Sequence, residues 1–300
     1  MHESPTPAVT VIVPTYNSSG ALRMSLETVL RQDFADFEVW VIGDGCTDDS
    51  ASVVRSFGDD RVHWTNLPVN SGAPAAPRNE GLRRARGKYV AYLGHDDLWF
   101  PWHLSGLMES IEKDGGDFAY SLGALIGPEG VVGVFSLPES PWNKRSAISP
   151  SNWMHRTSLA EHIGLWSTTI RIGDDRDFLR RAYAANTRFC FFRQLSVLKY
   201  PSLLWRTYSL TSAFPQSGRL EAIRRTPEAL RLELLQEVAE GMAKWGYRLG
   251  PQSSPCRKPL RWLVSLCMDA YGRHRWPLNR LLYWSWSRAS GLSEKKRNPE

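Results

Sequence analysis

The stretch that decides the fold is Val9-Thr10-Val11-Ile12-Val13-Pro14-Thr15-Tyr16-Asn17. Its first five residues form a β-branched run that is typical of a parallel strand buried on both faces, and Pro14 is expected to end that strand. After a polar break at residues 17–20, apolar residues recur at helical spacing through residue 30. This recurrence predicts an amphipathic helix capped near Ser18 or Ser19.

The alternation of strand-like and helix-like segments continues to residue 93. We expect strands at 37–42, 62–67 and 89–93, and helices at 47–57 and 75–86. Short loops between such segments indicate an α/β fold with a mostly parallel sheet and right-handed crossovers. In such sheets ligands bind outside the carboxyl ends of the strands, so the residues after each strand are the first candidates for a site.

Beyond residue 93 the pattern is looser. It predicts a helix at 104–113, a strand at 118–125 and a loop or hairpin at 127–151. Residues 153–185 are expected to be helical with a polar interruption at 173–175, and the chain is again helical in tendency from residue 219. The chain is therefore long enough for one large α/β domain with a helical extension.

Composition limits the class of protein. With 42% hydrophobic and 23% charged residues the chain is that of a folded globular protein. The four cysteines form no CxxC pair, and residues 1–7 do not look like a signal peptide, so we expect reduced thiols in the cytosol. No run of eighteen apolar residues is present, and this predicts no membrane span.

Carboxylates follow two of the expected strands. Asp44 lies between two glycines after residues 37–42, and Gly94-His95-Asp96-Asp97 follows residues 89–93. Neighbouring carboxylates at a strand end suit a hard divalent cation such as Mg²⁺ or Mn²⁺. The alternative is that Asp96 and Asp97 cap a helix starting at Leu98. Arg78, on the expected helix between these strands, is either a clamp for phosphate oxygens or a solvated helix residue.

The order of these pieces resembles family 2 glycosyltransferases. The resemblance is carried by residues 11–17, by residues 41–48 around Asp44, by residues 70–90 including Arg78-Asn79-Glu80-Gly81-Leu82, and by residues 92–101 around Asp96. Two departures stand out. Gly43 and Gly94 occupy positions where the family usually has the first carboxylate of an acidic pair, whereas Asp44 and Asp96 retain the second.

The resemblance implies a GT-A fold with a nucleotide-sugar-binding half (residues 1–115), an acceptor-binding half (116–215) and a helical C-terminal region (216–300). It implies that the nucleotide-sugar donor contacts Pro14, Thr15, Tyr16, Asp44, Arg78 and Asp96. Asp96 would hold the Mg²⁺ or Mn²⁺ that bridges the diphosphate. His95 and Asp97 are candidates to support this metal in place of the carboxylate missing at Gly94.

Residues 173–181 resemble the Glu-Asp-x-Asp-Leu segment of the inverting members of that family. In this resemblance Asp175 aligns with the family's catalytic base and Asp174 with the preceding glutamate. The alternative is that these residues are only an acidic helix start, which the helix dipole favours. The expected reaction moves a sugar to an acceptor hydroxyl of a glycan or a lipid-linked or other cell-envelope precursor, with inversion and with Asp175 taking the proton. The alternative is a nucleotide-sugar-binding protein that has lost catalysis. His155 is either an acceptor contact or a structural histidine.

The C-terminal region is basic and rich in Trp and Tyr. Basic residues outnumber acidic ones roughly two to one from residue 217, whereas the net charge of the whole chain is +6. Arginines and aromatic residues interleave between 257 and 288, which predicts either peripheral contact with the inner face of a membrane or packing on the protein. No nucleic-acid-binding motif accompanies the charge. A dinucleotide oxidoreductase is excluded because no Gly-x-Gly-x-x-Gly follows the first strand.

Overall fold

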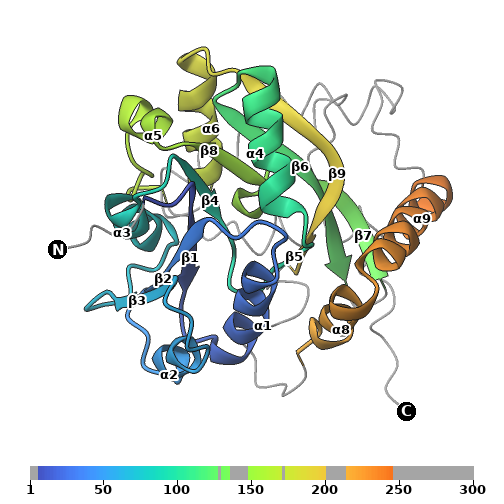
Figure 1. Cartoon of the computed structure of the whole chain (residues 1–300), viewed down its shortest axis with the longest axis horizontal. Coiled ribbons are helices and arrows are strands. Elements are labelled where there is room, and N and C mark those ends of the chain that lie inside the picture. The colour runs from blue at the N-terminus through green and yellow to red at the C-terminus, as the bar shows by residue number, and fades with distance from the viewer. Residues whose placement is uncertain (1–5, 128–129, 136–147, 171–172, 201–213, 246–300) are drawn as a thin grey trace, which may run out of the picture.

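The structure of the protein is a computed structural model that describes residues 6–127, 130–135, 148–170, 173–200 and 214–245 (Figure 1). In these residues the strands form one nine-stranded sheet of order β3-β2-β1-β4-β8-β6-β9-β5, and β7 pairs with β6. The strands are β1 (Val9–Thr15), β2 (Phe37–Gly43), β3 (Val62–Asn66), β4 (Tyr89–Tyr92), β5 (Leu98–Trp99), β6 (Phe118–Gly127), β7 (Gly130–Phe135), β8 (Trp153–Arg156) and β9 (Phe189–Lys199).

Helices cover both faces of this sheet. They are α1 (Ser19–Leu30), α2 (Ser50–Arg55), α3 (Ala75–Arg84), α4 (His103–Asp114), α5 (Thr157–Ile163), α6 (Asp174–Ala184), α8 (Ser217–Arg225) and α9 (Pro227–Trp245). One core cluster joins the sheet to α1, α2 and α4, and a second joins it to α3, α5 and α6. The expected α/β architecture is confirmed, with β1 to β4 parallel to one another.

Strand β1 lies between β2 and β4 and runs two residues further than expected. It includes Pro14, which pairs with Ile42 of β2. The carbonyl of Ile12 accepts a hydrogen bond from Leu93 on the β4 side, whereas Thr15 accepts one from Asp44 on the β2 side. Because partners alternate along a parallel strand, Pro14 faces the β4 side, where the pairing has already ended at Ile12. A residue without an N–H group is therefore tolerated there.

The first turn of α1 is capped from another segment. Ser18 is the N-cap residue, as expected, but its hydroxyl donates to the carbonyl of Tyr16 and makes no cap bond. The backbone N–H of Ser19 instead donates to Asp48 Oδ2 at 2.9 Å. A carboxylate at a helix N-terminus is favourable, and this one ties the loop after β2 to the loop after β1.

The second half of the domain differs most from the expectation. Residues 153–185 are not one interrupted helix: they begin with β8, which pairs antiparallel with both β4 and β6, and continue through α5 to α6. Strand β9 was not predicted at all, although it lies parallel to β6 inside the sheet. No helix starts at Leu98, which belongs to the short strand β5 on β9.

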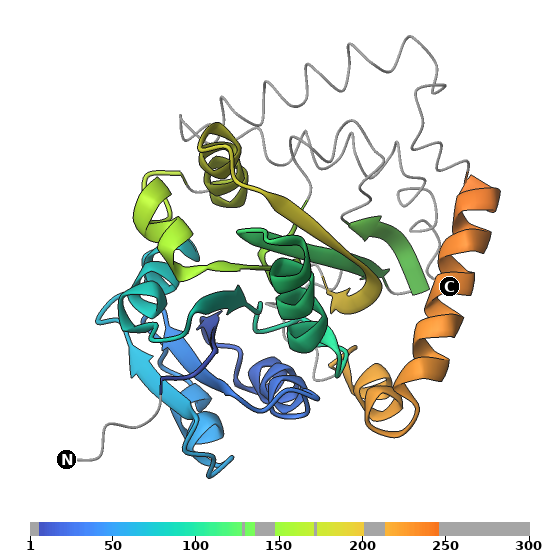
Figure 2. The ribbon, with the colours of Figure 1, turned by 45° about the horizontal axis from the view of Figure 1, so that its top comes forward.

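Helices α8 and α9 cover the far end of the sheet, where α9 lies beside β7 (Figure 2). A third core cluster joins these helices to β5, β6 and β9. Arg224 of α8 forms an ion pair with Glu27 of α1 at 2.5 Å, so α8 also touches the N-terminal half. The Trp-rich residues 257–288 of the C-terminal region lie outside the described residues. Within the described residues, no helix is both long and apolar enough to cross a membrane.

Candidate active site

The carboxyl ends of β1 and β2 bring Thr15 and Asp44 together. The backbone N–H of Asp44 donates to the carbonyl of Thr15 at 2.8 Å. Asp44 is only 5% exposed, and its carboxylate accepts hydrogen bonds from the backbone N–H of Ser71 at 3.0 and 3.1 Å and from the Ser71 hydroxyl at 3.0 Å. Tyr16 follows directly and is exposed. Three of the predicted donor-binding residues therefore meet at one edge of the sheet.

Gly43 marks the place of the first missing carboxylate. A Cβ atom at this position would lie 2.4 Å from Asn66 Oδ1 and 2.7 Å from Trp64 Cη2. Asn66 also exchanges two hydrogen bonds with the backbone of Cys46, each 2.9 Å long. The space of a side chain at residue 43 is thus already filled by two residues of β3, which explains why glycine is required here.

The loop after β4, residues 94–97, holds its two carboxylates in different ways. Asp97 is fully buried and is held by three donors. Its Oδ2 accepts from the Ser151 hydroxyl at 2.5 Å and from Lys199 Nζ at 2.8 Å, and its Oδ1 accepts from the backbone N–H of Tyr200 at 3.1 Å. Asp97 is therefore fixed as part of the protein framework.

Asp96 is half-buried, and no described residue is recorded as a hydrogen-bond donor to its carboxylate. Its backbone carbonyl accepts from the buried Gln216 Nε2 at 3.0 Å, which fixes the loop. Burial and the charge of Asp97 raise the pKa of Asp96, against the opposing effects of His95 and Lys199. A further positive charge near this carboxylate would lower its pKa and stabilise its ionised form.

These residues fit a divalent cation held through one carboxylate. Mg²⁺ and Mn²⁺ prefer oxygen ligands, and Mg²⁺ is commonly bound through one or two carboxylates together with substrate phosphates. Within the described residues, no group of three or more His, Cys, Asp or Glu residues is placed to hold a metal alone. His95 Nδ1 lies 3.3 Å from the carbonyl oxygen of Pro14, so that nitrogen faces the end of β1.

Lys199 belongs to the same group of charges and was missed by sequence reasoning. It is the last residue of β9, and its side chain is 26% exposed. Burial lowers the pKa of its ammonium group. The negative charges of Asp97 and Asp96 raise that pKa by a larger amount, so the pKa lies above its ordinary value. The only signal in the sequence would have been β9 itself, which ends beside the acidic loop.

Arg78 joins the two halves of the site. It lies in the first turns of α3, and its Nη1 forms an ion pair with Asp174 Oδ2 at 2.7 Å. The side chains of Arg78 and Asp174 are only 11% and 9% exposed. The Arg78 guanidinium also lies over the ring of Trp166, 4.4 Å from its centroid. Burial raises the pKa of Asp174, and Arg78 opposes that rise.

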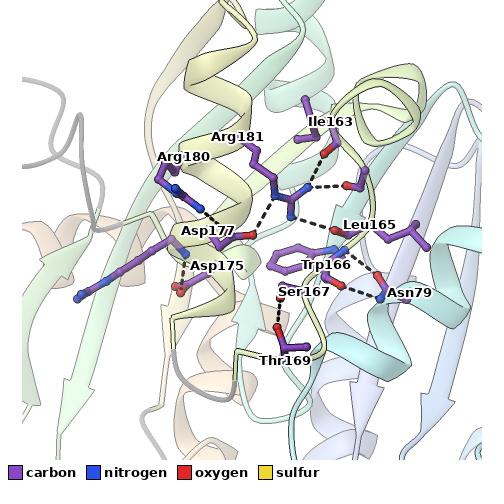
Figure 3. Close-up of polar contacts among 12 residues, drawn as sticks. Asn79, Ile163, Leu165, Trp166, Ser167, Thr169, Asp175, Asp177, Arg180 and Arg181 are labelled. Carbon is purple, nitrogen blue, oxygen red and sulfur yellow. Dashed lines mark hydrogen bonds and ion pairs between the residues drawn. The ribbon is translucent and has the colours of Figure 1, made fainter. Parts of the chain in front are cut away.

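The segment before α6 is held in place by a second set of contacts (Figure 3). Asn79 exchanges hydrogen bonds of 2.9 and 2.8 Å with the backbone of Trp166. Arg181 of α6 donates to the carbonyls of Ile163 at 2.6 Å and Leu165 at 2.9 Å, and Asp177 accepts from Arg181 at 2.9 Å. The start of the loop between α5 and α6 is therefore held against both α3 and α6.

Asp175 lies in the first turn of α6, beside this anchored loop (Figure 3). Its side chain is half-buried, and its Oδ1 accepts from the backbone N–H of Arg176 at 2.8 Å. Gly173, just before the helix, has a φ of 86°, a left-handed conformation that favours glycine. Its neighbour Asp174 contacts α3 through the ion pair with Arg78, so the first turn of α6 lies near the helix that follows β3.

His155 is a core residue. It is fully buried on β8, and its Nε2 lies 2.9 Å from the hydroxyl of Tyr92. Burial lowers its pKa to about 4, so the ring is neutral at physiological pH. The structural interpretation of this histidine fits the geometry, and the acceptor-contact interpretation does not.

Solved structures define the class of this fold. The structure is similar to residues 1–349 of S. aureus TarS in complex with UDP, with a TM-score of 0.57 and 20% identity over 94% of this chain and 88% of that one. It is also similar to the mannosyltransferase PcManGT from Pyrobaculum calidifontis in complex with GDP-Man and Mn²⁺, with a TM-score of 0.53 and 17% identity over 96% of this chain and 85% of that one. The fold is of the GT-A type.

Sequence comparison defines the family. The UDP-Glc:alpha-D-GlcNAc-diphosphoundecaprenol beta-1,3-glucosyltransferase WfgD of Escherichia coli is 30% identical over 131 residues, which is 44% of this chain and 51% of that protein. The chain thus spans about half the length of the curated relatives it matches. Residues 10–185 match the family described as Glycosyl transferase family 2. The chain belongs to this family.

Proposed function

We propose that the chain is an inverting glycosyltransferase that moves a sugar from a nucleoside-diphosphate sugar to a hydroxyl of a lipid-linked or cell-surface glycan. The observation that carries the proposal is the buried ion pair between Arg78 and Asp174 at 2.7 Å. It joins the helix that follows the donor-side strands to the helix that bears Asp175. A donor held near Asp44 and Asp96 and an acceptor held near Asp175 would then share one edge of the sheet.

Each carboxylate has a distinct task in this proposal. Asp44, fixed by Ser71, contacts the nucleoside together with Thr15 and Tyr16. Asp96 holds Mg²⁺ or Mn²⁺, which when bound neutralises the charge that develops on the leaving diphosphate. Asp175 accepts the proton of the acceptor hydroxyl as the new glycosidic bond forms, because a neutral hydroxyl is a weak nucleophile. Attack opposite the leaving group inverts the anomeric carbon, and no covalent enzyme intermediate is needed.

The test replaces the proposed base. In Asp175→Asn the side chain keeps its shape and its bond from Arg176, so donor binding measured by thermal shift should stay close to that of the wild type. Sugar transfer should fall by about 10²-fold or more, the usual contribution of a positioned base. Asp36→Asn is the matched control, because Asp36 is exposed and lies before β2 at the opposite edge of the sheet. An active Asp175→Asn enzyme would refute the assignment.

The second candidate function is nucleotide-sugar binding without catalysis. It is favoured by Gly43 and Gly94, which stand where the family usually has carboxylates. Turnover measured with a panel of nucleotide-sugars and Mn²⁺ in the presence of lipid-linked acceptor extracts separates the two functions. Binding without hydrolysis or transfer of any donor would favour the second one.

The proposed acceptor is lipid-linked because a relative is named for a diphosphoundecaprenol acceptor. Such an acceptor places the enzyme at the inner face of a membrane, in the cytoplasm. The basic, Trp-rich residues 257–288 are the proposed contact with that surface. Flotation with anionic vesicles tests this: the full chain should float, and a chain ending at Trp245 should not. Equal flotation of both chains would remove the tail from the proposal.

A further inference from the structure

The acidic loop after β4, residues 94–97, forms a salt bridge with a lysine from another strand. Lys199 Nζ lies 2.8 Å from Asp97 Oδ2, and Asp97 is fully buried. The lysine comes from the end of β9, more than a hundred residues later in the chain, and the sheet fixes its position because Leu198 pairs with Leu98 of β5. The two carboxylates of the loop and the ammonium group of Lys199 together carry a formal charge of −1, rather than the −2 of the carboxylates alone.

The ammonium group lies close enough to both carboxylates to affect their charge, but its salt bridge is with Asp97. Asp97 Oδ2 also accepts from Ser151, and Oδ1 accepts from the backbone of Tyr200, so both oxygens are engaged. Because Asp97 is also fully buried, a metal ion could reach its oxygens only if one of these donors moved away. The Asp96 carboxylate has no such donor recorded among the described residues, and it is the one left for a metal.

The same oxygen adjoins the position of the missing carboxylate. A Cβ atom at Gly94 would lie 2.9 Å from Asp97 Oδ2 and 3.1 Å from Asp96 Oδ1. The backbone N–H of Gly94 donates to the Ser151 hydroxyl at 3.1 Å, and that hydroxyl donates to Asp97. Glycine at 94 and lysine at 199 therefore act in the same direction: each lowers the negative charge available to a metal ion.

We propose that Lys199 is a positioning residue that keeps Asp97 in a salt bridge and leaves Asp96 as the single ligand of this loop for a divalent cation. The proposal rests on the donor site proposed above. Its consequence is that the empty loop binds Mn²⁺ weakly and acquires the ion together with a diphosphate, whose oxygens supply the remaining negative charge. Replacing the lysine by a neutral residue frees Asp97 and adds a second ligand.

The experiment measures Mn²⁺ binding by the purified full chain without nucleotide, by thermal shift and by titration calorimetry. Lys199→Met should bind Mn²⁺ about tenfold more tightly than the wild type or better, because one nearby positive charge is removed and one carboxylate is released. Lys199→Arg keeps the charge and should behave as the wild type. Lys199→Gln is a second neutral variant, for use if the methionine variant does not fold. Its amide can still donate to the buried Asp97 without carrying a charge.

The double variant Asp97→Asn, Lys199→Met identifies the second ligand. It carries no unpaired buried charge, and its Mn²⁺ affinity should return to the wild-type value. Equal affinity of the wild type and the neutral single variants would overturn the proposal, and so would an undiminished gain in the double variant. These Mn²⁺ affinities are measured without sugar transfer. A protein that shows the expected differences in Mn²⁺ affinity but transfers no sugar would therefore contradict the proposed activity and still support the role of Lys199.

Discussion

Replacing Arg78 by methionine should destabilise the protein strongly and in a pH-dependent way. Arg78 and Asp174 are 2.7 Å apart, and their side chains are only 11% and 9% exposed. Removing one partner of such a buried pair leaves the other charge uncompensated, and this costs about 3–5 kcal/mol. The exposed Arg83 on the same helix pairs with Glu80 on the surface, so Arg83→Met should cost less than about 1 kcal/mol.

The pH dependence follows from the pKa of Asp174. Burial raises this pKa in the folded protein, and Arg78 is the charged group that opposes the rise. In Arg78→Met the folded-state pKa rises further above the unfolded value, so the folded state binds the proton more readily. A carboxyl group with a raised pKa loses its stabilising contribution as pH rises through the folded value. The cost of the substitution should therefore be largest near pH 8 and shrink toward pH 5.

Urea denaturation of the wild type, Arg78→Met, Arg83→Met and the double variant Arg78→Met, Asp174→Asn at both pH values measures these costs. The double variant removes both charges and should regain most of the lost free energy of unfolding. A cost for Arg78→Met that equals that of Arg83→Met, or that stays constant between pH 8 and pH 5, would refute the reasoning.

Two further predictions concern the core and the edge of the site. Because the pKa of His155 is lowered to about 4 from an ordinary value of 6.5, its stabilising contribution is present above pH 6.5 and is lost as pH falls. Between neutral pH and pH 5 the wild type should lose about 2 kcal/mol of its free energy of unfolding through this histidine. Denaturant titration should show a smaller loss in His155→Gln, and an equal loss in both proteins would contradict the prediction. Gly43→Asp forces Cβ against Asn66 and Trp64 and should lower the free energy of unfolding by about 1–3 kcal/mol, whereas an unchanged midpoint would show that the two side chains move aside.

Much of the N-terminal half could be predicted because β1, β2 and β4 are buried on both faces. Glycine and aspartate end or follow two of these apolar strands, at residues 43–44 and 94–97, so strand ends and candidate ligands are visible together. Asp44 and Asp96 were chosen as candidate ligands in this way. Asp97 could not be distinguished from Asp96, because its donors Ser151, Lys199 and Tyr200 lie far away in the chain.

The second half was harder to predict because its strands lack a regular pattern. In β9 the exposed Arg193 and Gln194 interrupt the apolar residues, and the register against β6 shifts between Ser121 and Leu122. Strand β8 has only four residues, too few to show a period of two. The partner of Arg78 was also missed, because α6 and α3 are brought together by the sheet and by the Asn79–Trp166 contact.

The path of the chain through the acidic loop has a consequence for synthesis. Asp96 and Asp97 leave the ribosome before Ser151, Lys199 and Gln216, which hold them in the finished protein. At the usual speed of translation, about 5–20 residues per second, the interval between Asp97 and Gln216 is roughly 6–24 s. Asp97 gains its ion pair once Lys199 has been made, whereas the backbone of Asp96, the proposed metal ligand, is fixed only after Gln216 has been made.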